Sequence, residues 1–92
     1  MQTSGAMPRV CEFYGIAIYV YYGEHGPPHF HARHAGREMS MAIDDLSILA
    51  SGLTPRATGM VAEWAALRRV ELQRAWQQAR ASEPIDRIEP LR

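Results

Sequence analysis

The chain has 92 residues, of which 47% are hydrophobic and 22% are charged, and its ten basic and ten acidic residues cancel. A chain of this length builds one small domain around one core. This charge balance argues against a protein that coats nucleic acid by bulk charge. The single cysteine, Cys11, excludes an internal disulfide and a multi-thiolate zinc site. No apolar run is long enough to cross a bilayer and no signal peptide is recognisable, so we expect a cytoplasmic protein without a membrane segment.

The domain is expected to open with a β-hairpin. Residues 1–6 (MQTSGA) carry no pattern and form the expected loose leader of a domain that spans residues 7–81. A strand over 9–13 and a strand over 16–22 can be joined by the two-residue turn Tyr14-Gly15. The pairings expected on the core face of this hairpin are Phe13 with Ile16 and Cys11 with Ile18.

All four histidines fall within ten positions, around a Gly-Pro-Pro corner, and they are His25, His29, His31 and His34. A third strand over 29–34 follows the corner. Alternation sends Phe30 and Ala32 to the core, so the opposite face takes His29, His31 and Arg33, together with Tyr19 and Tyr21 of the second strand. Pairing Gly23 with His29 keeps both faces consistent and predicts Tyr21 opposite His31 and Tyr19 opposite Arg33.

A second two-residue turn, Ala35-Gly36, leads into a fourth strand over 37–43. Its register predicts four cross-strand pairs: Phe30 with Met41, Ala32 with Met39, Arg33 with Glu38, and His31 with Ser40. The segment 46–50 (LSILA) is compatible with a fifth strand or with one helical turn, and the pattern leaves both open.

One long helix is expected from the Thr54-Pro55 start to about Ala81. Its apolar stripe consists of Ala57, Met60, Val61, Trp64, Leu67, Leu72 and Ala75, with Val70 and Trp76 at the flanks. Arg68 and Glu71 interrupt the stripe, and a helix-surface ion pair is the favoured interpretation. The tail over 82–92 is expected to be extended and to be ordered by a partner. The fold class is therefore α+β: an antiparallel meander of four or five strands packed on one long C-terminal helix.

The face that carries the histidines suggests acid-base chemistry on RNA. His29 and His31 are the candidates for proton transfer, and Arg33 is the candidate for binding a phosphate. Tyr19 and Tyr21 can stack on bases. The candidate substrate-binding set is Tyr19, Tyr21, Glu24, His25 and His34, with Glu24 and His25 positioning the corner.

Two other interpretations remain open from the residues. His25, His29 and His31 could bind one zinc or nickel ion, because side chains at i and i+2 of a strand project from the same face. The histidines could instead be structural, so that the open face, the sheet edge or the tail binds another protein without chemistry. The oligomeric state is left open.

The sequence EHGPPHFHARH at Glu24–His34, with EWxxLxxxEL at Glu63–Leu72 and then Trp76, resembles the domain of unknown function 4160 family. The similarity extends from Met7 to Arg80, and its signature is Glu24, His25, Pro27, Pro28, His29, Phe30 and His31. The resemblance implies a small prokaryotic protein, often encoded beside a second small gene in an arrangement that looks like a toxin-antitoxin pair. It therefore implies a cognate small protein as partner, and it names no reaction.

Overall fold

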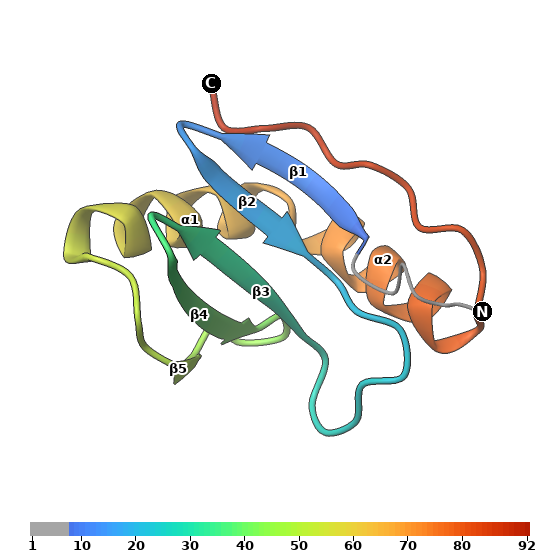
Figure 1. Cartoon of the computed structure of the whole chain (residues 1–92). Coiled ribbons are helices and arrows are strands. Elements are labelled where there is room, and N and C mark those ends of the chain that lie inside the picture. The colour runs from blue at the N-terminus through green and yellow to red at the C-terminus, as the bar shows by residue number, and fades with distance from the viewer. Residues whose placement is uncertain (1–7) are drawn as a thin grey trace.

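A computed structural model describes residues 8–92, so the expected leader lies outside the described residues. Five antiparallel strands form one sheet in the order in which they occur in the chain, and two helices follow (Figure 1). The strands are β1 (Arg9–Phe13), β2 (Ile16–Tyr19), β3 (His29–His34), β4 (Arg37–Ala42) and β5 (Ile48–Ala50). The α+β class and the antiparallel meander are confirmed, and the segment left open in the sequence contains a fifth strand.

Two hairpin turns hold the registers that the sequence predicts. Tyr14 and Gly15 have φ of 51° and 78°, and Ala35 and Gly36 have φ of 52° and 77°. Positive φ at both central residues is the type I′ geometry, whose twist matches that of the flanking strands. The predicted pairs across both turns are confirmed, from Phe13 with Ile16 to Phe30 with Met41.

The predicted pairing between β2 and β3 is wrong by two residues. β2 ends at Tyr19, which lies opposite His31, whereas the sequence predicted Arg33 as its partner. Beyond Tyr19 the chain stays with the first strand, because the Val20 N–H donates to the Pro8 carbonyl at 3.3 Å. A shift of two residues preserves the side-chain alternation, so each residue keeps its predicted face.

The single long helix of the prediction is also wrong, because α1 (Pro55–Leu67) and α2 (Arg69–Arg80) meet at Arg68. Arg68 has φ −117° and ψ 24°, outside helical geometry. A continuous helix would carry this arginine in the middle of its buried stripe, and long charged side chains are rarely buried without a partner. The break leaves Leu67 65% exposed, although the stripe placed it in the core, and Arg68 forms the predicted ion pair with Glu71 at 3.4 Å.

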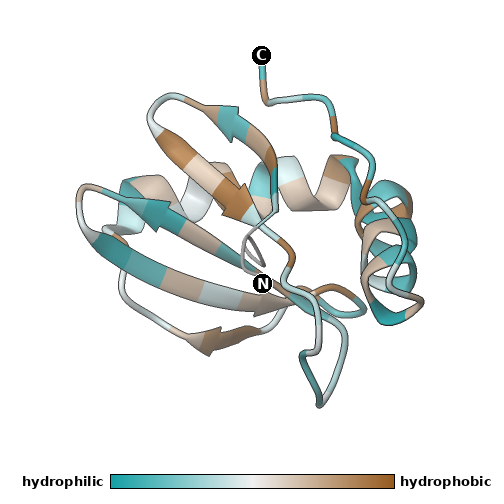
Figure 2. Ribbon diagram, turned by 45° about the vertical axis from the view of Figure 1, so that its right-hand side comes forward, coloured by the Kyte–Doolittle hydropathy of each residue, from teal (hydrophilic) through white to brown (hydrophobic). Residues whose placement is uncertain are grey.

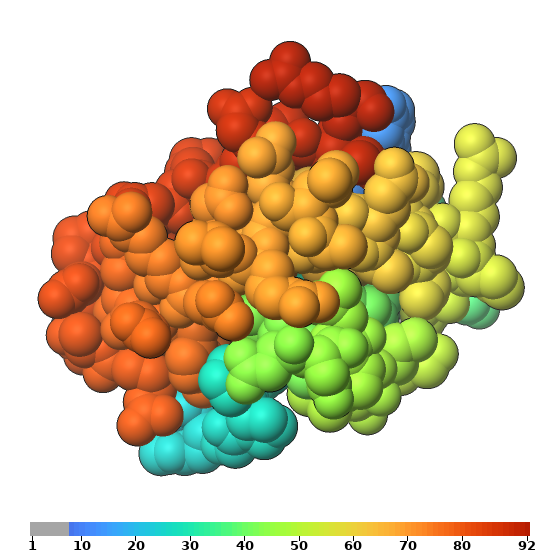
Figure 3. Space-filling view, turned by 180° about the vertical axis from the view of Figure 1, so that it is seen from behind, coloured from blue at the N-terminus to red at the C-terminus, as the bar shows by residue number. Residues whose placement is uncertain are grey.

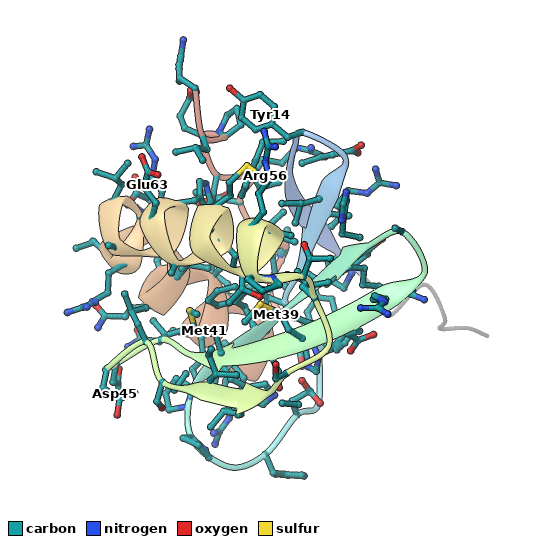
Figure 4. All side chains as sticks on the ribbon, turned by 90° about the vertical axis from the view of Figure 1, so that its left-hand side faces the viewer. Tyr14, Met39, Met41, Asp45, Arg56 and Glu63 are labelled. Carbon is teal, nitrogen blue, oxygen red and sulfur yellow. The ribbon has the colours of Figure 1, made fainter. Side chains whose placement is uncertain are left out.

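The helices cover one face of the sheet, and the core lies between the helices and that face. Figure 3 shows α1, α2 and the C-terminal segment over the back of the molecule, and Figure 2 shows apolar and polar residues alternating along the strands. Met39 and Met41 lie between the sheet and α1 (Figure 4). Cys11 is buried there, and burial raises the pKa of its thiol above the ordinary value. No helix within residues 8–92 is long and apolar enough to span a membrane.

The C-terminal segment after α2 makes several contacts with the rest of the chain. It runs alongside β1 (Figure 1), where the Ile88 N–H donates to the Val10 carbonyl at 2.8 Å and the Ile88 side chain is buried. The indole Nε1 of Trp64 donates to the Glu89 carbonyl at 2.7 Å, and the Tyr22 hydroxyl donates to the Glu83 carbonyl at 2.7 Å. The segment thus covers part of the outer edge of the sheet.

Replacement of Thr54 with alanine is expected to lower the free energy of unfolding by about 1 kcal/mol. The Thr54 hydroxyl accepts a hydrogen bond from the Ala57 N–H at 3.2 Å, and Pro55 occupies the first helical position. Alanine leaves that N–H without its cap. Urea denaturation of the two proteins measures the difference, and a serine at the same position should recover most of it.

Candidate functional site

The histidine face is the side of the sheet opposite the core. His29 and His31 alternate along β3 with the buried Phe30 and Ala32, so both imidazoles leave the sheet on the other side. Their side chains are only 11% and 15% exposed, because neighbouring residues surround the rings. The face that the sequence predicted for these histidines is the face on which they lie.

One carboxylate joins the two imidazoles. Glu24 comes from the loop between β2 and β3, and its Oε1 atom lies 2.8 Å from the Nε2 of His29 and 2.6 Å from the Nε2 of His31. The other ring nitrogen of His29, Nδ1, lies 2.8 Å from the carbonyl of Pro27. The loop between β2 and β3 therefore supplies both a side chain and a backbone oxygen to the site.

A second carboxylate reaches His31 from β4. The Nδ1 of His31 lies 2.9 Å from the Oε2 of Glu38, whose other oxygen lies 3.6 Å from the Nε of Arg33. The pairing of Arg33 with Glu38 across the strands places this carboxylate diagonally beside His31. His31 is thus held at both ring nitrogens by acidic side chains.

Aromatic rings enclose the two histidines on opposite sides. The Tyr21 ring centroid lies 4.5 Å from that of His31, and Tyr19 stacks on Tyr21 at 5.9 Å. On the other side, Trp76 of α2 lies 5.2 Å from His29. Burial, and secondarily the charge of Glu38, raises the pKa of Tyr21 above its ordinary value, so its hydroxyl keeps its proton at neutral pH.

Two of the four histidines lie apart from this cluster. His25 is exposed in the corner, and it is not among the groups that converge with His29 and His31. His34 alternates to the helix side of the sheet, where it lines a cavity of about 550 Å³ together with Tyr14, Arg56 and Glu63. Figure 4 shows these three residues gathered around α1, away from the histidine face. The expected roles of His25 and His34 in binding substrate gain no support from these positions.

Sequence reasoning missed two contributors to the site. Glu38 was assigned only to Arg33, although its diagonal position beside His31 follows from the same register. Trp76 was placed at the flank of a helix covering the core, and it contacts His29 because α2 changes direction after Arg68. The first contact had a signal in the sequence, whereas the second depends on where the helix breaks.

The cluster contains the donor atoms of a potential metal site. Glu24, His29 and His31 each offer one atom, and these atoms lie within 4.8 Å of one another. The expected ligand set contained His25 where the structure has Glu24. The same atoms can also transfer protons without a metal, because imidazole and carboxylate both serve as acids and bases near neutral pH.

The structure defines a small α+β domain with a histidine-carboxylate cluster on the open face of its sheet. The chain belongs to the family described as Domain of unknown function (DUF4160), whose profile matches residues 15–77. That match contains the complete cluster together with the aromatic residues around it, from Tyr19 to Trp76. No curated protein and no solved structure matches the chain significantly.

Proposed function

We propose that this domain cleaves RNA at its histidine face, as the toxin of a toxin-antitoxin-type two-gene module. One observation carries the proposal: two imidazoles lie beside each other at a shared carboxylate, with Nε2 atoms 2.8 and 2.6 Å from Glu24 Oε1. The choice of RNA follows from the chemistry that this face offers. The two-gene module follows from the gene arrangement that the family resemblance implies, with the neighbouring small protein as partner.

The chemistry needs a proton acceptor, a proton donor and a cation. RNA carries its own nucleophile, and one imidazole accepts the proton of the ribose 2′-hydroxyl while the 2′-oxygen bonds to phosphorus. The second imidazole donates a proton to the 5′-oxygen as the phosphorus–oxygen bond breaks, which yields a 2′,3′-cyclic phosphate and a 5′-hydroxyl. Arg33, about half exposed beside Glu38, is the cation that would contact the phosphate.

The tyrosines favour a single-stranded substrate. Tyr19 and Tyr21 form a stacked pair that ends at the ring of His31. Unpaired bases can continue such a stack, and each base stacked on an aromatic side chain contributes about 1–3 kcal/mol. This arrangement would place the sugar-phosphate backbone of a bound strand near His29 and Arg33.

The test uses purified protein and a short single-stranded RNA with one labelled end. His29→Ala and His31→Ala are each expected to lower kcat/KM by about 10²–10⁴-fold, because each removes one proton-transfer group. Arg33→Ala is expected to lower it by about 10²-fold, whereas Arg69→Ala, an exposed arginine at the start of α2, should leave it unchanged. Mass spectrometry of the product identifies the cyclic phosphate.

Expression in a bacterial host tests the biological role. Growth arrest that disappears in the His29→Ala, His31→Ala double variant, with the variant still folded by circular dichroism, agrees with a catalytic toxin. Growth arrest of unchanged strength in that variant contradicts it. Coexpression of the neighbouring gene should restore growth and yield a protein that copurifies.

The second candidate function is a protein-binding module without chemistry. Leu67 and Val70 are 65% and 75% exposed, and they flank the break between α1 and α2. Large exposed apolar side chains at one place on a surface are typical of a contact for another protein. Loss of partner binding in Leu67→Ser, with binding retained in the double histidine variant, would favour this function.

A further inference from the structure

The hydrogen bonds of His29 determine where its proton lies. A carbonyl oxygen only accepts, so the contact of 2.8 Å between Nδ1 and the Pro27 carbonyl places a hydrogen on Nδ1. In neutral imidazole the other nitrogen then carries a lone pair. That nitrogen, Nε2, points at the Oε1 of Glu24 at 2.8 Å, so two electron-rich atoms face each other.

His31 repeats the same pattern with different partners. Its Nδ1 lies 2.9 Å from the Oε2 of Glu38, and its Nε2 lies 2.6 Å from the same Glu24 oxygen. Each histidine is therefore held at Nδ1 by an acceptor outside the cluster and directs Nε2 into it. Metal-binding histidines have this arrangement, in which a carboxylate or backbone carbonyl accepts the second N–H and fixes the tautomer and the ring orientation.

We infer that Glu24, His29 and His31 bind one divalent transition-metal ion through Oε1 and the two Nε2 atoms. Where these three electron-rich atoms meet, either protons or one metal ion must lie between them. One divalent ion in place of two protons leaves the net charge of the cluster unchanged. It also satisfies all three atoms at once, whereas two protons crowd two N–H groups onto a single carboxylate oxygen.

The donor set selects the class of metal. Two imidazoles and one carboxylate suit zinc and its neighbours nickel, cobalt and iron(II), whereas magnesium and calcium prefer oxygen ligands alone. Ligand atoms around a tetrahedral zinc lie about 3.3 Å apart, given metal–ligand distances of about 2.0–2.2 Å. The two contacts of Glu24, at 2.8 and 2.6 Å, need to lengthen by about 0.5 and 0.7 Å to reach that separation, which side-chain rotation can supply.

The surroundings leave the metal accessible from one side. Trp76 packs beside His29 and Tyr21 beside His31, so apolar rings flank the ligands. Glu24 remains 29% exposed, which keeps a path from solvent to the cluster. Three protein ligands with an open position are typical of catalytic rather than structural zinc sites. The inference concerns the same site as the proposed cleavage of RNA, but it depends only on ligand atoms. A bound ion would occupy the two Nε2 atoms that proton transfer uses, so the proposed reaction belongs to the metal-free protein.

The test is a calorimetric titration of zinc chloride into the untagged, chelator-stripped full chain. We expect one zinc per chain, and a cobalt(II) complex with visible absorption typical of four or five ligands. Glu38→Gln is expected to weaken zinc binding by about 10–100-fold, as outer partners of metal ligands do. Glu24→Gln should weaken it more than Glu38→Gln does, because it changes a ligand.

Matched controls separate the centre from adventitious binding. Glu12→Gln alters a carboxylate that is paired with Arg9 and lies outside the cluster, and it should leave zinc affinity unchanged. His34→Asn should do the same, whereas His29→Asn should weaken binding strongly. Circular dichroism checks the fold of each variant. If a ligand variant unfolds, Glu38→Gln still tests the site, because it changes a partner of His31 and no ligand.

The metal centre and the RNA reaction can fail separately. Zinc near zero per chain, or equal weakening of zinc binding by Glu12→Gln and Glu24→Gln, would overturn the metal centre. One tightly bound zinc per chain that depends on Glu24 supports it. If the metal-free protein leaves RNA intact, only the proposed function fails.

Discussion

Replacing Gly52 with alanine is expected to lower the free energy of unfolding by about 3 kcal/mol. A Cβ atom on Gly52 would lie 2.0 Å from the Glu38 carbonyl oxygen and 3.1 Å from its carbonyl carbon. Both atoms belong to the backbone of β4, so no side-chain rotation relieves the overlap. The connection between β5 and α1 would have to move away from the sheet, which also disturbs the buried Leu53 next to it.

Thermal unfolding followed by circular dichroism measures this effect. A loss of about 3 kcal/mol corresponds to a decrease in Tm of about 12–24 °C for a domain of this size. Gly59→Ala is the matched control, because nothing lies within 4 Å of its added Cβ and the position is inside α1. Alanine there should raise stability by about 0.5–1 kcal/mol. Equal Tm values for Gly52→Ala and the natural protein would contradict the close approach of the two backbones.

The Gly52 substitution also connects the fold to the site. Glu38 contributes its backbone to the contact with Gly52 and its carboxylate to the contact with His31. A shift of β4 at this residue should therefore weaken zinc binding, although Gly52 itself touches no ligand. Gly59→Ala should leave zinc binding unchanged.

Most of the sheet could be predicted because its determinants are local. Alternation of apolar and polar residues assigns the faces, and the two-residue turns at Tyr14-Gly15 and Ala35-Gly36 fix the adjoining registers. The corner between β2 and β3 has no such constraint, since its loop is long enough for several registers. There β2 ends at Tyr19 and the Val20 N–H bonds to the Pro8 carbonyl, an arrangement that only the three-dimensional structure reveals.

The helical layer and the site required long-range information. Arg68 was recognised as an interruption of the apolar stripe, but the pattern alone did not show that the helix ends there. That break brings Trp76 to His29 from a region far away in the sequence. The choice of Glu24 rather than His25 as the third member of the cluster depends on the path of the corner, because neighbouring residues in a loop point in different directions.

Replacing Trp64 with alanine is expected to cost about 3–5 kcal/mol, which is a large fraction of the stability of a small domain. Trp64 is 0% exposed, and its ring lies 5.5 Å from that of Phe13 and 5.8 Å from that of Phe30. Its removal opens a cavity where α1 meets the sheet. Urea denaturation should show a much lower midpoint, or a protein unfolded in buffer.

Trp64→Phe separates the hydrogen bond from the packing. Phenylalanine keeps much of the apolar volume but removes the indole N–H that donates to the Glu89 carbonyl at 2.7 Å. Loss of such a bond costs about 0.5–1.5 kcal/mol. The C-terminal segment should open more often, because Glu89 loses this link to α1 and the neighbouring bond from Ile88 to Val10 then breaks more easily. Hydrogen exchange at the Ile88 amide reports that opening.

Leu67→Ala is the control for both Trp64 variants, because it changes an exposed position of the same helix. It should change the free energy of unfolding by less than about 0.5 kcal/mol. Equal destabilisation by Leu67→Ala and Trp64→Ala would mean that α1 does not bury Trp64 against the sheet.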